Sequence, residues 1–235
     1  YEVQKATTNK FISIALELGG KDPAYVRHDA DIEKTVENLV DGSFFNSGQS
    51  CCGIERIYVD KKIYNDFLEL FIDKTYGYKL GDPLNKDTNL GPVVKLSSAK
   101  FIKDQINLAV KQGARNMIDE SKFNYPKEHE NYMTPQVLTK VNHEMKFMME
   151  ETFGPCVGIM PVDNDNEGVN LMNDSPYGLT ASIWTKDIGV AEKLGNEIDT
   201  GTLFMNRCDY LDPGLSWTGV KETGRGCSLS EIAYE

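Results

Sequence analysis

The chain has 235 residues, 40% of them hydrophobic and 26% charged, a composition typical of a globular protein with a sizeable core. Its 36 acidic residues outnumber 25 lysines and arginines, so the formal net charge is -11 and we expect no nucleic-acid partner. No apolar run reaches the roughly 20 residues of a membrane-spanning helix, and we expect no membrane partner.

Five cysteines lack the spacing of a disulfide framework or a metal site. We therefore predict no metal and a cytoplasmic or other reducing compartment. The chain begins at Tyr1 inside a helical pattern, without an initiator methionine. We expect it to be a truncated fragment, in which N-terminal targeting signals are not visible.

Strand-like and helix-like patterns alternate along the chain, which predicts βαβ units around a mostly parallel sheet. In chain order, the patterns predict the end of a helix and then an apolar strand-like run within residues 1–18, a helix over 31–47, a strand over 54–59, a helix over 62–76, a loop over 81–92, a helix over 96–111, a surface excursion over 119–134, a strand over 135–138, a strand over 157–162, a helix over 165–172, a strand over 179–185, a helix over 188–198 and a strand over 201–205. In the helix over 96–111, we expect Phe101, Ile102, Ile106 and Val110 to face inward.

Residues 44–53 combine the end of a helix with two adjacent cysteines. Asp31 can cap a helix whose apolar residues recur up to Phe44, and Gly48 ends that pattern. Cys51 and Cys52 follow in the turn beyond it. These residues alone leave two readings open: a buried, inert thiol, which is the usual state of free cysteine, or a thiol that a ligand can approach past the flanking glycines.

A second stretch, Leu-Glu-Leu-Gly-Gly-Lys-x-Pro over residues 16–23, places Glu17 at the end of an apolar run. With Phe-x-Asn-x-Gly-Gln-x-Cys over 44–51 and Glu-Thr-Phe-Gly-Pro over 151–155, it resembles, in order, the signatures of the NAD(P)-dependent aldehyde dehydrogenase superfamily. Residues 217–226 resemble the family's closing Phe-Gly-Gly-x-Lys-x-Ser-Gly segment, with Trp-Thr where the family has Phe-Gly. The resemblance covers essentially the whole chain.

The resemblance implies an α/β fold, a three-layer αβα catalytic domain with a mostly parallel sheet, flanked by short pieces of a Rossmann-like coenzyme domain. It assigns residues 1–19 to the C-terminal tail of the coenzyme-binding domain, 20–209 to the catalytic domain, and 210–235 to a return segment toward the coenzyme domain. It also implies a homo-oligomeric parent, either a dimer or a tetramer.

The same resemblance implies that Cys51 is the nucleophile and Cys52 a bystander. A thiolate adds to the carbonyl of a small-molecule aldehyde, and the oxyanion so formed can expel hydride. Glu17 is implied as the base that activates water to hydrolyse the thioester; the alternative is that Glu17 pairs with a lysine such as Lys21. Because a water-activating base is present, we expect a carboxylic acid product rather than transfer to coenzyme A.

Glu151 and Phe153 are the implied cofactor-binding residues, the carboxylate for the nicotinamide ribose hydroxyls and the ring for its flank. The cofactor is NAD or NADP, since the residue that distinguishes them would lie upstream. The pyrophosphate-binding turn and an oxyanion-binding Asn would also lie upstream, so we expect the fragment alone to be inactive. Arg56 matches a family arginine that we expect to tie the active-site loop to carboxylates.

Two other functions remain open on the sequence. One is a non-catalytic binding or assembly module derived from this family. The other is a cofactor-independent thiol esterase that uses Cys51 and Glu17. The sequence does not identify the aldehyde. The three histidines have no partner spacing, so we expect structural or surface roles for them.

Overall fold

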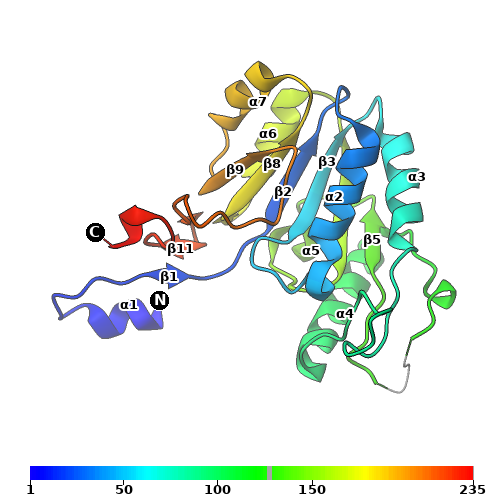
Figure 1. Cartoon of the computed structure of the whole chain (residues 1–235), viewed down its shortest axis with the longest axis horizontal. Coiled ribbons are helices and arrows are strands. Elements are labelled where there is room, and N and C mark those ends of the chain that lie inside the picture. Colours follow the sequence, from blue (N-terminus) through cyan, green and yellow to red (C-terminus); the bar gives the residue numbers. More distant parts are fainter. Residues whose placement is uncertain (126–128, 235) are drawn as a thin grey trace.

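The computed structural model describes residues 1–125 and 129–234 and is built on a seven-stranded sheet with the order β4-β5-β6-β3-β2-β8-β9 (Figure 1). Strand β4 is antiparallel to β5, whereas the other neighbours in this sheet run parallel. The sheet strands are β2 (Asp22–Val26), β3 (Ile54–Asp60), β4 (Arg115–Asn116), β5 (Gln136–Thr139), β6 (Cys156–Val162), β8 (Thr180–Trp184) and β9 (Thr202–Met205). The predicted mostly parallel α/β fold is confirmed.

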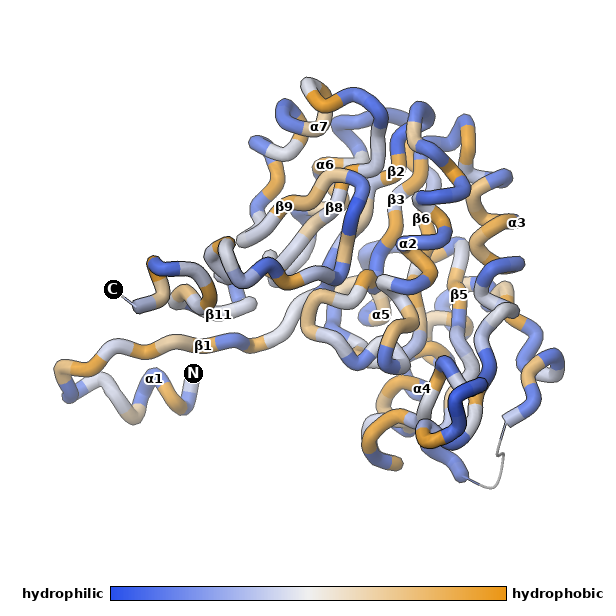
Figure 2. The backbone as a smooth tube through the Cα atoms, in the orientation of Figure 1, coloured by the Kyte–Doolittle hydropathy of each residue, from blue (hydrophilic) through white to orange (hydrophobic). Residues whose placement is uncertain are grey.

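Helices cover both faces of the sheet, giving three layers. The helices are α2 (Ile32–Phe44), α3 (Tyr64–Thr75), α4 (Leu96–Lys111), α5 (Lys146–Met149), α6 (Asp165–Asn173) and α7 (Ile188–Gly195). Helices α2 and α3 pack on one face, and α4, α5, α6 and α7 supply the cluster on the other. Apolar strands lie between the polar outer surfaces of these helices (Figure 2). Among the described residues, no helix combines the length and apolar character of a membrane span.

The core follows from alternation along the central strands. In β3, Tyr58 belongs to the cluster under α4, while Ile57 and Val59 belong to the cluster under α2 and α3. All seven residues of β3 are buried, as expected for a parallel strand covered on both faces. Burying such side chains contributes about 1.5–3 kcal/mol each.

Side-chain caps fix where several helices begin. Asp31 accepts a hydrogen bond from Lys34 N–H at the start of α2, as the sequence predicts. Asn164 and Asp187 do the same for α6 and α7. Helices α2, α6 and α7 follow β2, β6 and β8, so these caps lie at the carboxyl edge of the sheet.

Residues 1–19 and 210–234 form a paired arm beside the sheet, and the two termini lie near each other (Figure 1). It contains α1 (Glu2–Thr7), β1 (Leu16–Glu17), β10 (Val220–Lys221), β11 (Gly224–Arg225) and the 3-10 turn η3 (Glu231–Tyr234). Strand β1 pairs with β11, and β10 pairs with the short strand β7 (Tyr177–Gly178). The apolar strand-like run predicted within residues 1–18 is wrong except at Leu16, because Phe11 and Ile12 are exposed and only Leu16 of that run enters a ladder.

Two further expectations about helices are wrong in detail. The α-helix predicted over 31–47 ends at Phe44 and continues as the turn η1 (Phe45–Gly48). In α4, Phe101 and Val110 are exposed rather than inward, because the buried stripe runs through Ala99, Ile102, Gln105, Ile106 and Ala109.

The predicted excursion over 119–134 includes the turn η2 (Glu120–Lys122). Its described parts bury Phe123 and Met133, so it is not wholly a surface segment. Residues 126–128 of that prediction lie outside the described residues.

Candidate active site

The predicted site residues lie just before the parallel strands, at the amino edge of the sheet. Glu17 precedes β2, Cys51 precedes β3, and Glu151 and Phe153 precede β6. Since β2, β3 and β6 are parallel with β3 between the other two, their amino ends meet at one edge. The fold therefore brings together three segments that are more than 30 residues apart in the sequence.

The turn before Cys51 is held in an unusual conformation. Asn46, Ser47 and Gly48 all have left-handed backbones, with φ of 51°, 59° and 68°. For non-glycine residues this costs about 1–2 kcal/mol each. Three side-chain hydrogen bonds offset the cost: Asn46 Nδ2 to Gln49 O at 3.0 Å, Gln49 Nε2 to Asn46 O at 2.9 Å, and Ser47 Oγ to Gly91 O at 2.6 Å.

Glycines allow the three segments to approach closely. A Cβ on Gly48 would lie 2.1 Å from the carbonyl oxygen of Gly154. A Cβ on Gly19, which has φ of 105°, would lie 2.6 Å from Glu151 Oε1. A larger residue at Gly48 would have to move the backbone of Gly154, and one at Gly19 would adopt a strained φ and displace the Glu151 carboxylate.

Cys51 is exposed, so the buried-thiol reading is wrong for this residue. A hydrogen bond from the Cys52 side chain lowers the pKa of Cys51 to about 7, helped by the Cys51 N–H and opposed by burial and by the charges of Glu17 and Asp209. A thiol with this pKa is substantially ionised at neutral pH, whereas an ordinary thiol is mostly protonated.

Cys52 is buried and bonded to Asp209. Its sulfur lies 3.0 Å from Asp209 Oδ1, which also accepts a hydrogen bond of 2.7 Å from Ser50 Oγ. The hydrogen bond to Cys51, burial and Asp209 all raise the pKa of Cys52, so this thiol keeps its proton. The Cys52 S–H can donate either to Asp209 or to the Cys51 sulfur. When it donates to Cys51, it stabilises the Cys51 thiolate.

Glu17 and Cys51 line one cavity of about 170 Å³, closed partly by Trp217 and Ser228 from the returning segment. Ser228 Oγ donates to Glu17 Oε1 at 2.9 Å. The alternative in which Glu17 pairs with Lys21 is wrong, since Lys21 Nζ donates to Glu55 instead. A carboxylate and a thiol thus line the same partly open cavity.

Glu151 and Phe153 lie in a separate surface depression of about 440 Å³, together with Val94 and Phe101. Glu151 Oε1 accepts a hydrogen bond from Gly20 N–H at 3.0 Å. Within the described residues no donor is recorded for Oε2, which remains able to accept from a ligand hydroxyl. Burial raises the pKa of Glu151, with Gly20 N–H acting in the opposite direction.

The depression has the chemistry that a nicotinamide riboside requires. A carboxylate oxygen faces it, and the ring of Phe153 is 40% exposed beside it. The exposed side chains of Val94 and Phe101 supply apolar walls. The residues that are present therefore fit the cofactor predicted from the sequence.

Arg56 has a structural role, but its partners differ from those expected. Its guanidinium donates to backbone carbonyl oxygens, not to carboxylates: to Lys21 O at 2.8 Å and, at the end of α6, to Leu171 O and Met172 O. It joins the segment that follows Glu17 to α6 through the buried middle of the sheet.

Sequence reasoning missed three polar residues of this edge. Asp209 lies at the end of the predicted catalytic domain and Ser228 in the returning segment, and no local pattern marks either of them. Glu55 carried a signal, since an acid in the second position of a buried strand needs a partner. Its partners, Lys21 and the backbone of residues 152–153, could not be named without the fold.

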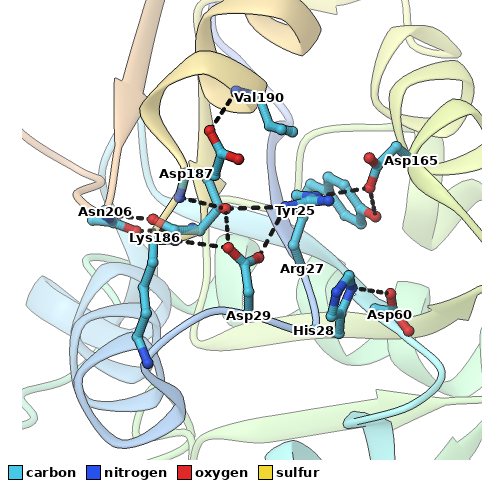
Figure 3. A network of polar contacts seen from close by, with 11 residues as sticks. Tyr25, Arg27, His28, Asp29, Asp60, Asp165, Lys186, Asp187, Val190 and Asn206 are labelled. Carbon is cyan, nitrogen blue, oxygen red and sulfur yellow. Dashed lines mark hydrogen bonds and ion pairs between the residues drawn. The ribbon is translucent and has the colours of Figure 1, made fainter.

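The opposite, carboxyl edge of the sheet holds a closed polar network (Figure 3). Asp165 accepts from Tyr25 Oη at 2.7 Å and from Arg27 Nε at 2.9 Å. Asp29 accepts from Arg27 at 2.9 Å and from Thr185 Oγ1 at 2.7 Å.

The histidines have structural partners where the structure records hydrogen bonds for them. His28 pairs with Asp60 at this edge, at 3.0 Å. His143 bridges Tyr58 and Asp174 at 2.8 and 2.7 Å. In the described ranges no cluster of His, Cys, Asp or Glu could hold a metal ion.

The chain is similar in sequence to known dehydrogenases of several aldehydes. The 3-sulfolactaldehyde dehydrogenase of Priestia aryabhattai is 35% identical over 223 residues, covering 94% of this chain and 46% of the relative. The 4-trimethylaminobutyraldehyde dehydrogenase of Mus musculus is 32% identical, again over 94% of this chain and 46% of the relative.

A crystal structure of betaine aldehyde dehydrogenase from Staphylococcus aureus in complex with NAD+ superposes with a TM-score of 0.92 and 31% identity, over 99% of this chain and 46% of that one. The chain thus spans about half the length of the relatives it matches. The sequence profile of the aldehyde dehydrogenase family matches residues 1–235, and the chain belongs to that family.

Proposed function

We propose that this chain carries the nucleophile and the general base of an aldehyde dehydrogenase that oxidises an aldehyde to a carboxylic acid with NAD or NADP. The observation that supports it most is the shared cavity of Cys51 and Glu17, in which the pKa of Cys51 is lowered to about 7. The NAD+ in the related betaine aldehyde dehydrogenase supports the cofactor.

In this mechanism the Cys51 thiolate attacks the aldehyde carbon, and the carbonyl oxygen becomes an oxyanion. The Cys51 N–H is the donor that we assign to that oxyanion. When bound, the cofactor accepts the hydride that leaves the carbon. A thioester on Cys51 remains, and water must attack it.

Glu17 is the base that we assign to this water. It lines the cavity of Cys51, and Ser228 Oγ holds one of its carboxylate oxygens at 2.9 Å. The water passes its proton to the carboxylate as it attacks, the Cys51 sulfur leaves, and the carboxylic acid is released. A water-activating base next to the thiol favours hydrolysis over transfer to coenzyme A.

The domain boundaries remain a proposal as well. The arm of residues 1–19 and 210–234 pairs with itself through β1 and β11 rather than joining the main sheet. This supports residues 20–209 as the catalytic domain and the arm as coenzyme-domain pieces. An oligomeric parent and inactivity of the 235 residues by themselves stay predictions, tested by sedimentation and by assay of this chain alone.

The test uses the full-length protein and follows NAD(P)H formation with a panel of aldehydes. Cys51→Ala should lower turnover at least ~10³-fold, since no other group can form the thioester. Cys52→Ala is the matched control and should keep a measurable rate. Wild-type turnover in Cys51→Ala would refute the proposal.

A second function is favoured by the separation of the two pockets. Cys51 and Glu17 share a cavity that contains neither Glu151 nor Phe153. The same thiol and base can therefore hydrolyse an activated ester without any cofactor. Release of 4-nitrophenol from 4-nitrophenyl acetate, lost in Cys51→Ser, supports this activity; no release at all would exclude it.

A further inference from the structure

A buried ion pair lies beneath the Glu151–Phe153 segment without lining either pocket. Lys21 is 1% exposed and Glu55 is 5% exposed, and Lys21 Nζ donates to the Glu55 carboxylate. Lys21 also lies 5.2 Å from the centre of the Phe147 ring. Removing two charges from water is costly, so a buried pair of this kind is weak support for stability alone and invites a search for another role.

The Glu55 carboxylate binds two consecutive backbone amides. Oε2 accepts from Thr152 N–H at 2.9 Å, and Oε1 accepts from Phe153 N–H at 2.9 Å. Charge-assisted bonds to N–H groups are stronger than neutral ones. They hold Phe153 in a left-handed conformation, with φ of 54°, which a phenylalanine does not favour.

Lys21 also contacts the segment that the Glu55 carboxylate binds. Its Nζ donates to Thr152 Oγ1 at 2.9 Å, so both partners of the ion pair contact Thr152. The preceding residue, Gly20, donates its N–H to Glu151 Oε1. The backbone before β2 therefore fixes the Glu151 side chain, while the ion pair fixes the backbone that follows Glu151.

We propose that Lys21 and Glu55 are positioning residues for cofactor binding, which set the backbone of Thr152 and Phe153 so that the Glu151 carboxylate and the Phe153 ring face the nicotinamide ribose. The proposal rests on the proposed function for its cofactor. Neither residue touches the reacting atoms, so each acts through residues 151–153. Disturbing the ion pair should therefore weaken cofactor binding and leave the reactivity of the Cys51 thiol unchanged.

The experiment compares Glu55→Gln with the double variant Lys21→Met/Glu55→Gln in the full-length protein. In the single variant, the glutamine NH2 must face either the Lys21 ammonium or Phe153 N–H, and both orientations place donor against donor. In the double variant, the glutamine oxygen can accept from Thr152 N–H and Phe153 N–H, and its NH2 no longer faces an ammonium. We expect KM for NAD(P) to rise about tenfold in the single variant, with a smaller change in kcat, and to recover in part in the double variant.

Alkylation of Cys51 by iodoacetamide separates this role from general damage, and its rate should stay within about twofold of wild type in both variants. An unchanged KM in a folded single variant would overturn the proposal. So would a loss of Cys51 alkylation equal to the rise in KM, because that would mean that the whole edge had collapsed.

Hydrogen exchange of the wild-type protein keeps the proposal testable if the variants do not fold. The amides of Thr152 and Phe153 should be protected, and rapid exchange there would contradict the contacts on which the proposal stands. If the wild type oxidises no aldehyde, the proposed function fails by itself. Hydrogen exchange at the Thr152 and Phe153 amides, measured with and without added NAD+, would still test the positioning role.

Discussion

The two edges of the sheet place acids and bases in opposite electrostatic situations. At the carboxyl edge, burial raises the pKa of Asp165 and Asp29, but hydrogen bonds and the Arg27 charge outweigh it and lower both values. At the amino edge, burial raises the pKa of Asp22 and of Glu151 and is not fully offset. One edge stabilises its charges, whereas the other leaves them poorly compensated.

The difference supports the amino edge as the place of the proposed chemistry. Perturbed acids beside an exposed thiol are typical of an active site, while fully paired acids are typical of structure. Ligands of open α/β sheets commonly bind outside the carboxyl ends of the strands. Here that edge carries the Asp165, Arg27 and Asp29 network (Figure 3), and the candidate site lies at the amino edge.

The largest expected effect is on turnover, when the proposed general base Glu17 at the amino edge is replaced. Glu17→Gln should slow steady-state turnover about 10²–10⁴-fold, because an amide cannot take the proton of the attacking water. Rapid-quench measurement should still show one equivalent of NAD(P)H formed quickly, since attack by Cys51 and hydride loss precede hydrolysis. Equal slowing of the first turnover would show that Glu17 acts before the thioester.

The fold could be predicted, and the candidate site residues could be proposed, because their signals are local. Periodic apolar residues marked α2, α3 and α6, and signature segments marked Glu17, Cys51 and Glu151. The left-handed turn at Asn46 and Ser47 could not be predicted, because it depends on a bond to Gly91 more than 40 residues away.

The partners of the site were equally hidden from the sequence. Ser228 and Glu17 are 211 positions apart, and Asp209 and Cys52 are 157 apart. Such pairs depend on how the arm and the residues just before it fold onto the sheet. Motifs point to the candidate reacting groups, whereas the residues that contact these groups follow only from tertiary structure.

The carboxyl edge should respond in stability and not in chemistry. Asp165→Ala removes the acceptor of Tyr25 Oη and Arg27 Nε, which should lower the free energy of unfolding by about 1–3 kcal/mol. Urea denaturation measures this. Asp163→Ala is the control, since its ion pair with Lys61 is exposed and should change stability by less than ~1 kcal/mol. A loss of Cys51 alkylation in Asp165→Ala would break the separation of the two edges.

The pH dependence of stability sharpens the same contrast. The folded-state pKa values of Asp29 and Asp165 lie below the ordinary 3.8, so these acids stabilise the folded protein above about pH 4. That contribution is lost as pH falls through the lowered values. The double variant Asp29→Asn/Asp165→Asn should be less stable than wild type at pH 7, with the gap narrowing below pH 4. A gap of constant size would show that charge is not its cause.

A smaller effect is expected from the residue that holds the base. Ser228→Ala removes the hydrogen bond to Glu17 Oε1 and should slow hydrolysis about two- to fivefold, as an exposed hydrogen bond contributes ~0.5–1 kcal/mol. Ser230→Ala is the matched control, because Ser230 Oγ bonds Ser216 Oγ and not the base. Single-turnover decay of the acylated protein measures both. Equal effects in the two variants would remove the assigned role of Ser228.

The smallest expected change is in the pKa of Cys51 when the nearby charge of Asp209 is removed. Asp209 raises the pKa of Cys51 and also attracts the Cys52 proton that would otherwise stabilise the thiolate. Asp209→Asn should therefore lower the pKa of Cys51 below about 7, by less than about one unit at this partly exposed site. Cys52→Ala should act in the opposite direction and move it toward the ordinary 9.0, because the donor is lost.

The rate of iodoacetamide alkylation as a function of pH, read at each cysteine by peptide mass spectrometry, gives both values. Asp41→Asn is the control, since Asp41 is near Asp209 but not among the groups that shift Cys51. If Asp209→Asn and Cys52→Ala moved the Cys51 pKa the same way, Asp209 would act by orienting Cys52 toward Cys51. The amino edge would then resemble the carboxyl edge, where an acid works by holding its neighbours in place.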